Sequence, residues 1–317
     1  MPRIDFGLWL DVGLPSQTLA SRLEELAPLL AAAEEAGFGS VWVGEAWPRG
    51  PREWHQQIPS LPLLAALASL TPLRLGTGVL LLPAWSPLNL AYQAAALDQL
   101  SGGRLTLGVG SGMPDLRERF GVARERLGER LDETIVLLKS LWAGAPGFSG
   151  RLLSAPGPIA PLPVQPGGPP VLPGGRVERA LKRAALLGDG WYAATTYPLP
   201  LIERLATRYR ALCAGAGRPA GAVTANRFFA VAGSREEAER AAEPYRAALD
   251  EHYGVPPETH EDVYLVGDPE HVNRLLEGYA AAGVTQIAAR VAPAGLPVQQ
   301  AVRTVRLLGR EVVPAWR

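Results

Sequence analysis

The chain contains 317 residues, and its 31 basic and 31 acidic side chains give a formal net charge of zero at pH 7. Hydrophobic residues make up 47% and charged residues 20%, a balance that predicts a large buried core. Zero net charge argues against a nucleic-acid-binding protein. The apolar runs are shorter than the ~20 residues of a membrane span, and the first residues lack the pattern of a secretory signal. We therefore expect a cytoplasmic protein with neither a nucleic-acid nor a membrane partner.

The scarce residues exclude several kinds of chemistry. Cys213 is the single cysteine, which excludes an internal disulfide and a thiolate metal cage. The four histidines show no metal-ligand spacing, so we expect no metal site. The two lysines, Lys139 and Lys182, fall in predicted helices, which disfavours Schiff-base chemistry at a strand end. The scarce residues thus exclude more chemistry than the abundant ones suggest.

Short apolar runs alternate with amphipathic helices along the chain, a pattern typical of parallel βα units. The first predicted helix ends at Gly37, and two later helices begin at the capping residues Ser234 and Asp268. The predicted strands are Ile4–Leu10, Ser40–Glu45, Leu75–Leu82, Leu105–Gly110, Val171–Gly174, Gly190–Ala194, Ala225–Ala232 and Gln286–Val291. The other predicted helices include Leu61–Leu70, Pro87–Leu100, Arg124–Trp142, Val177–Leu187, Leu199–Ala214 and Val298–Leu308.

This alternation predicts an α/β protein with the (β/α)₈ architecture of a TIM barrel, in which residues 1–317 form a single domain. A doubly wound open sheet is the alternative. Residues 144–173 are rich in Gly and Pro and show no helical period, so they are predicted to be an insertion segment formed by a loop or a short hairpin. An interdomain linker is the second interpretation of this segment.

In a TIM barrel the carboxyl ends of the strands carry the active site. Glu45 ends the second strand and is the best ionisable candidate: a base, a hydrogen-bond partner of a bound ring, or a salt-bridged structural residue. Arg290 ends the last strand and would hold an anionic substrate or form a structural ion pair. Trp9 and Trp47 would form an aromatic wall for the substrate, although scattered tryptophans are more often core residues.

Glycines gather at three of these strand ends. Gly174, Gly175 and Arg176 lie between a strand and a helix, where free N–H groups and an arginine bind an anion or merely complete a turn. Gly78 predicts either a bulge beside a ligand or a concession to packing. The glycines from 108 to 112 do not have the G-x-G-x-x-G spacing. They would let a ring lie against the backbone or relieve crowding in the barrel.

Taken together, several segments resemble the bacterial luciferase-like monooxygenase family in the order in which they occur. The resemblance covers nearly the whole chain, and the ordered set is far more specific than any one of its parts. The segments are AEEAGFGSVWVGE at 33–45, LGTGVLLLP at 75–83, LDQLSGGRLTLGVGSG at 97–112, GDGW at 188–191 and VGDPE at 266–270.

The resemblance implies a (β/α)₈ barrel that uses reduced FMN or the deazaflavin coenzyme F420, often as a homodimer. Carried over by position, Gly78 and Val79 would form a bulge supporting the flavin ring. Ser111 and Gly112 would face the ring or its ribityl chain. The resemblance also implies that the turn Gly174–Arg176 binds the cofactor phosphate.

Two departures from the family pattern bear on the reaction. Ala46 stands where many relatives have a histidine, and Met113 stands where the deazaflavin-dependent sugar-phosphate dehydrogenases have a catalytic glutamate. The leading prediction is a flavin-dependent monooxygenase that uses reduced FMN and O₂ on a small organic substrate, with a separate flavin reductase as partner. The alternatives are F420-dependent hydride transfer and a non-catalytic flavin-binding protein.

Overall fold

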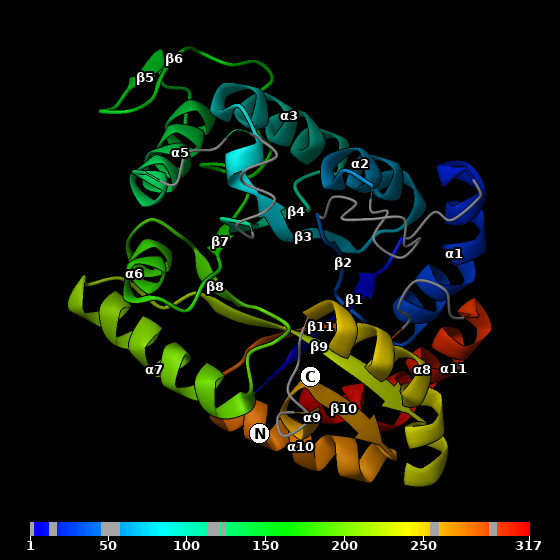
Figure 1. Cartoon of the computed structure of the whole chain (residues 1–317). Coiled ribbons are helices and arrows are strands. Elements are labelled where there is room, and N and C mark those ends of the chain that lie inside the picture. Colours follow the sequence, from blue (N-terminus) through cyan, green and yellow to red (C-terminus); the bar gives the residue numbers. More distant parts are fainter. Residues whose placement is uncertain are drawn as a thin grey trace.

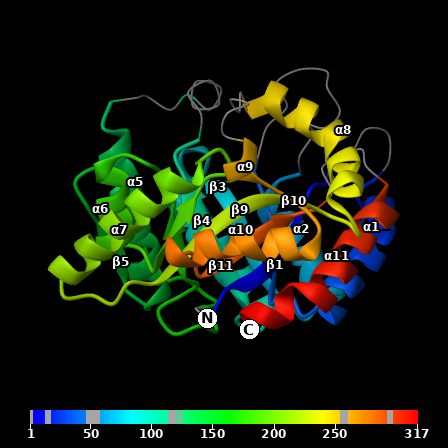
Figure 2. The same ribbon diagram turned by 90° about the horizontal axis from the view of Figure 1, so that it is seen from below.

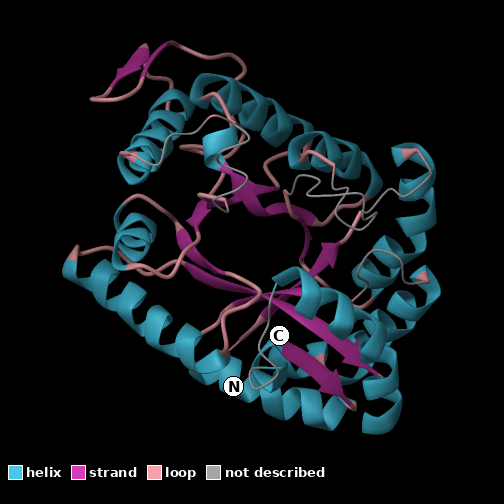
Figure 3. Cartoon of the chain, viewed as in Figure 1, coloured by secondary structure: helices cyan, strands magenta, loops and turns pink. Residues whose placement is uncertain are grey.

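The computed structural model describes residues 3–12, 18–45, 58–112, 121, 125–253, 260–291 and 297–317. Its centre is a ring of parallel strands surrounded by helices, seen end-on in Figure 1 and coloured by secondary structure in Figure 3. The strands of the ring are β1 (Asp5–Leu10), β2 (Ser40–Val43), β3 (Arg74–Leu81), β4 (Leu105–Gly110), β7 (Val171–Pro173), β8 (Gly190–Ala193), β9 (Ala222–Val231) and β11 (Gln286–Arg290).

The ring closes through one contact between strands that are distant in sequence, and through contacts between consecutive strands on the opposite side. Strand β1 pairs with the last strand, β11, so that Trp9 lies opposite Arg290. On the other side β8 pairs with β9, and a single bridge between Gly174 and Tyr192 joins the end of β7 to β8. The predicted TIM barrel is therefore confirmed, and the open sheet is wrong.

The outer layer consists of the helices that follow the strands. Their apolar faces pack on the ring, as the periodicity of the sequence predicts. These helices are α1 (Leu19–Glu35), α2 (Ser60–Leu70), α3 (Pro87–Leu100), α5 (Leu127–Trp142), α6 (Glu178–Leu186), α7 (Leu199–Gly215), α10 (Pro269–Ala281) and α11 (Val298–Glu311). Two short 3₁₀ turns, η2 (Leu82–Ala84) and η4 (Val313–Trp316), complete this layer.

The predicted helix ends agree closely with the observed ones. Helix α1 is followed by Gly37, whose φ of +77° is costly for any residue with a side chain. The Asp268 carboxylate accepts a hydrogen bond from the His271 N–H at 2.8 Å and caps α10. In the turned view of Figure 2 the two chain termini lie together on the side opposite to the raised helix α8 (Arg235–Tyr253).

One strand, β10 (Tyr264–Gly267), was not predicted from the sequence. Strand β9 is ten residues long and continues beyond the ring. Its second half pairs with β10 (Tyr264–Gly267), which follows the single-turn helix α9 (His260–Val263). Because the backbone groups of a buried strand need partners, β10 completes the hydrogen bonding that the ring leaves open. Helix α8 covers this extension, with Ala238 and Ala242 in a small second core.

The insertion segment contains a short hairpin, formed by β5 (Gly147–Ser149) and β6 (Ser154–Pro156). Glu133 of α5 accepts three backbone N–H bonds from the hairpin turn, each between 2.8 and 2.9 Å. Farther along, the Gln165 side chain donates to Asp98 of α3 at 2.7 Å and to the Leu105 carbonyl at 2.8 Å. Hydrogen bonds from both halves of the segment therefore hold it against the barrel, and its last residues form β7.

Candidate functional site

Strand β3 contains the bulge that the sequence suggested. Its pairing with β4 changes register between Thr77 and Leu80, and the peptide bond between Gly78 and Val79 is cis. A Cβ atom on Gly78 would lie 2.3 Å from the Tyr192 hydroxyl and 2.5 Å from the Trp9 ring. Glycine is therefore required here by packing inside the barrel, while the half-buried Val79 lies beside the bulge.

The glycines at the end of β4 serve different purposes. A Cβ atom on Gly108 would lie 2.2 Å from the Thr77 carbonyl oxygen, so this glycine relieves crowding between neighbouring strands. Gly112 has a φ of +69° and directs the chain away from the strand. Ser111, just before it, is half-buried and lines a pocket at the edge of the barrel.

The turn between β7 and α6 has the geometry of an anion site. Gly174 donates its N–H to the Val109 carbonyl at 2.8 Å, so this N–H continues the pairing with β4 and, contrary to the expectation from the resemblance, is not free for a phosphate. Gly175, which follows it, has a φ of +131°. A Cβ atom on Gly175 would lie 2.7 Å from the Ala180 methyl group, so the backbone can be approached closely only because this position is glycine. In the first turn of α6 the Ala180 N–H donates to the Val177 carbonyl at 2.8 Å, whereas the N–H groups before it have no acceptor within the helix. The positive end of the helix dipole lies at the same pocket.

This pocket has a volume of about 300 Å³. Four residues predicted to bind a cofactor lie in its wall, namely Ser111, Gly174, Gly175 and Arg176. The remaining wall is formed mainly by α5 and α6 and contributes two more arginines. Its residues are Leu82, Val109, Gly110, Leu127, Gly128, Leu131, Pro173, Val177, Arg179, Ala180 and Arg183.

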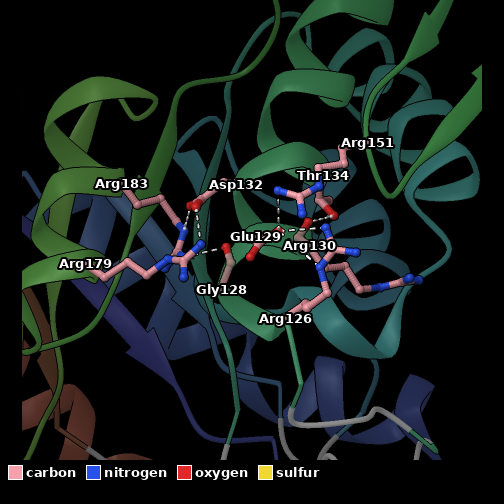
Figure 4. Close-up of polar contacts among 9 residues, drawn as sticks. All are labelled: Arg126, Gly128, Glu129, Arg130, Asp132, Thr134, Arg151, Arg179 and Arg183. Carbon is pink, nitrogen blue, oxygen red and sulfur yellow. Dashed lines mark hydrogen bonds and ion pairs between the residues drawn. The ribbon is translucent and has the colours of Figure 1, made fainter.

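Arg179 and Arg183 extend from α6 toward Asp132 of α5, as Figure 4 shows. The Arg183 Nε donates to Asp132 at 2.6 Å and its Nη2 donates to the Gly128 carbonyl at 2.9 Å. Burial lowers the pKa of the Arg183 guanidinium, and the Asp132 carboxylate opposes that shift. Arg179 reaches Asp132 at 3.2 Å and stays 54% exposed. The pocket therefore combines one fixed arginine with one whose charge is still accessible.

Arg179 and Arg183 were not among the residues predicted from the sequence to bind a cofactor. Positions 179 and 183 are separated by four residues, the spacing that places side chains on one face of a helix, and Arg176 lies just before that helix. The signal was therefore present once the helix start at Glu178 was recognised.

Glu45 lies at the end of β2 and is buried. Its Oε2 accepts a hydrogen bond from the Leu81 N–H at 2.7 Å and one from the Trp85 ring N–H at 3.1 Å. Burial raises the pKa of the Glu45 carboxyl, and those two donors, together with nearby Ser60, partly offset the rise. Its other oxygen, Oε1, has no hydrogen-bond partner within the described part of the chain. Glu45 thus links the segment after β2 to the end of β3 through a hydrogen bond. Its catalytic role stays a prediction.

Arg290 and Trp9 meet at the mouth of the barrel, together with Asp11. Arg290 donates through Nε and Nη2 to the Asp11 carboxylate, and both side chains are buried. The Trp9 ring N–H donates to the same carboxylate at 3.3 Å, while the Arg290 guanidinium carbon lies 5.6 Å from the Trp9 ring centre. The structural ion pair is therefore present, and contact of these residues with a substrate stays a prediction.

Trp47, with Ala46, His55 and Met113, lies outside the described residues. Within the described ranges, no group of three or more His, Cys, Asp or Glu side chains is arranged to hold a metal ion. None of the helices in those ranges is both long and apolar enough to cross a membrane. Cys213 is buried in α7.

Comparison with known proteins identifies the family. The model of the luciferase-like monooxygenase family matches residues 4–286. The chain belongs to this family, whose members are flavin-dependent monooxygenases and related oxidoreductases, and the resemblance inferred from the sequence is confirmed.

Three relatives show the range of the family. The F420-dependent hydroxymycolic acid dehydrogenase of Mycobacterium tuberculosis is 32% identical over 235 residues, which cover 71% of this chain and 64% of that protein. The oxygenase component of the flavin-dependent trigonelline monooxygenase of Acinetobacter baylyi is 34% identical over 162 residues, covering 49% and 44%. The crystal structure of monooxygenase RslO1 from Streptomyces bottropensis has a TM-score of 0.87 and 25% identity, covering 99% and 100%. Flavin-dependent and F420-dependent relatives are thus both represented.

Proposed function

We propose that this chain is a flavin-dependent oxidoreductase, and specifically a monooxygenase that uses reduced FMN and O₂ on a small organic substrate. The observation that carries the proposal is the turn Gly174–Gly175–Arg176, which opens a helix amino end and three arginines onto one pocket. Glycine at position 175 leaves room that a Cβ atom would fill, and a phosphate group fits the donors around it.

The proposed binding mode uses the residues predicted from the sequence. Gly175 and Arg176 would hold the phosphate, and Ser111 and Gly112 would lie along the ribityl chain. The bulge at Gly78 and Val79 would support the ring. When bound, reduced FMN would supply the chemistry that uses O₂. This redox chemistry belongs to the cofactor and not to side chains of the protein.

Glu45 is the proposed proton-handling residue. Burial raises the pKa of this carboxyl above that of an exposed glutamate, and its buried Oε1 lacks a hydrogen-bond partner in the described chain. A proton held at Oε1 would be available to a reacting group in the barrel mouth.

F420-dependent hydride transfer is the second candidate. It is favoured by Arg179, whose charge stays accessible in the pocket beyond Arg176. A coenzyme with further acidic groups beyond its phosphate would use that second cation. A non-catalytic flavin-binding protein is the third candidate, because Ala46 replaces the histidine expected from the resemblance.

Separate titrations with FMN and with F420, followed by fluorescence or calorimetry, decide among these candidates. The proposal expects FMN to bind and F420 to bind more weakly. Tight binding of F420 with negligible binding of FMN would replace the first candidate by the second. Binding of neither would contradict all three.

A separate flavin reductase is the partner we propose, in the cytoplasm, with residues 1–317 acting as one domain. The relative from Acinetobacter baylyi is an oxygenase component by name, which supports a reductase on a separate chain.

We further propose a homodimer formed through α2 and α3. These adjacent helices carry a single charged residue, Asp98, and it is buried, whereas Leu70, Tyr92 and Leu100 are exposed. A two-fold contact places each residue near its own copy, so a face without charges suits self-association. Tyr92→Arg should convert the dimer to a monomer in analytical ultracentrifugation, and a monomeric parent protein would contradict this proposal.

A further inference from the structure

Asn226 is a buried polar residue on the inner surface of the barrel. Along β9 the side chains alternate between the two faces, and Arg227 points outward, where its Nε donates to the Tyr279 hydroxyl at 2.6 Å. Its neighbours Asn226 and Phe228 therefore point inward. The inward face is confirmed by Phe228, whose ring centre lies 5.0 Å from the Arg290 guanidinium carbon at the barrel mouth.

The Asn226 amide lies among apolar and aromatic groups. The residue is only 2% exposed, and its register partner on β11 is Ala288. Ala288 belongs to the interior cluster that also contains Trp9 and Tyr192. The Asn226 Oδ1 atom is buried and has no hydrogen-bond partner among the described residues. A buried amide oxygen without a partner costs free energy, and such atoms are rare in native structures.

Thr224 shows that the fold can satisfy a polar group at this depth. It lies two residues earlier on the same face of β9, and its hydroxyl donates to the Gln286 side chain on β11 at 2.9 Å. The chain therefore pairs one inward polar residue and leaves the next one, closer to the mouth, without a partner. Functional sites often keep groups that lower the stability of the fold. The Asn226 oxygen without a partner therefore indicates a position that binds a ligand.

The charge of the surrounding mouth restricts what that ligand can be. Arg290 and Asp11 neutralise one another through two hydrogen bonds, and Trp9 and Phe228 lie against the guanidinium. An anion would have to displace the Asp11 carboxylate from a buried pair, whereas an uncharged body can pack on the rings without that cost.

We propose that Asn226 is the hydrogen-bonding residue of a substrate subsite that takes an uncharged, largely apolar molecule carrying one hydroxyl or N–H donor. The donor gives its hydrogen bond to Asn226 Oδ1, and Trp9 contacts the apolar body. This assignment rests on the proposed function, because it places the organic substrate at the mouth of the barrel. The turn at Gly175, on the β7 side, remains for the cofactor.

The first test compares thermal unfolding of Asn226→Leu and Thr224→Val without any ligand. Leucine removes an unsatisfied oxygen, so Asn226→Leu should raise the melting temperature by about 2–4 °C. Thr224→Val breaks a satisfied bond and should lower it by a similar amount. A lower melting temperature for Asn226→Leu would show that the amide supports the fold, and would overturn the proposal.

The second test measures binding of three probes to the cofactor-free chain by calorimetry: 2-naphthol, 2-naphthoate and naphthalene. The parent protein should bind 2-naphthol at least about 10-fold more tightly than 2-naphthoate, because Asp11 compensates the Arg290 charge among the described residues and Oδ1 accepts the hydroxyl. Asn226→Leu should lose about 10-fold in affinity for 2-naphthol and keep its affinity for naphthalene. Asp11→Asn, which removes the Asp11 carboxylate from the Arg290 guanidinium, should shift the preference toward 2-naphthoate.

Equal or tighter binding of 2-naphthoate by the parent protein would overturn the proposal. So would an unchanged affinity of Asn226→Leu for 2-naphthol, or no binding of any probe. FMN affinity is measured on the same samples. Failure of FMN to bind contradicts the proposed function, whereas intact FMN binding with the wrong probe preference contradicts only the substrate subsite.

Discussion

Two arginine–aspartate pairs flank the proposed site, and they differ in burial. Arg290 and Asp11 close the ring between β11 and β1, with side-chain exposures of 6% and 3%. Arg179 and Asp132 join α6 to α5 at the pocket, with exposures of 54% and 31%. A buried pair cannot lose one partner without leaving an uncompensated charge, whereas an exposed pair exchanges its partner with water at little cost. The first pair is therefore part of the fold, and the second is available to an anionic ligand.

Breaking the buried pair should have the largest effect. Asp11→Ala leaves the Arg290 guanidinium buried without its carboxylate and should lower the free energy of unfolding by about 3–5 kcal/mol. Urea unfolding measures this loss. The double variant Asp11→Leu with Arg290→Met is the control, since an apolar pair of similar volume should recover most of the stability. A loss below about 1 kcal/mol in Asp11→Ala would remove the contrast between the two pairs.

Placing a negative charge in the pocket should abolish most cofactor binding. Gly175→Asp brings a carboxylate against the proposed phosphate position and should weaken FMN binding by about 100-fold or more. Gly175→Ala is the matched control, because it creates the same contact with Ala180 and the same backbone strain without the charge. Equal affinities of the two variants would show that charge at this turn is irrelevant.

The pH dependence of stability should reveal the Glu45 carboxyl. Burial raises its pKa in the folded state above the ordinary value of 4.5, so the folded protein favours the protonated form. This contribution is fully present below the ordinary pKa and is lost as the pH rises through the raised one. The stability of Glu45→Gln relative to the parent protein should therefore increase from about pH 4.5 upward. A difference that does not vary with pH would contradict the burial of an ionisable group here.

The exposed pair should make the smallest contribution to stability. Arg179→Ala should change the free energy of unfolding by at most about 1 kcal/mol, since surface ion pairs are worth little. It should nevertheless weaken FMN binding, and this effect should shrink with added salt because the pocket is open to solvent. A stability loss comparable with that of Asp11→Ala would show that the two pairs are equivalent.

Most of the fold could be predicted because it depends on local patterns. Alternation of apolar runs with amphipathic helices located all eight strands of the ring, and glycines such as Gly37 marked helix ends. Strand β10 was missed because its four residues lie between helical segments and pair with a strand that extends beyond the ring.

The site was predicted in part. Gly174, Gly175, Arg176 and Ser111 lie around one pocket, as expected for neighbouring strand ends. The partner of Arg290 lies 279 residues away, and only closure of the barrel brings it into contact. Asn226 gave no signal in the sequence, because an unsatisfied oxygen is recognised only when all neighbouring donors are placed.

The central claim is that the pocket at Gly174–Arg176 binds the phosphate of a flavin cofactor. Its most direct test compares the affinities of the chain for FMN and for riboflavin, which has the same ring and ribityl chain but no phosphate. Hydrogen bonds to a charged group are worth about 1.5–3 kcal/mol, so FMN should bind at least about 10-fold more tightly. Equal affinities for FMN and riboflavin would contradict the claim.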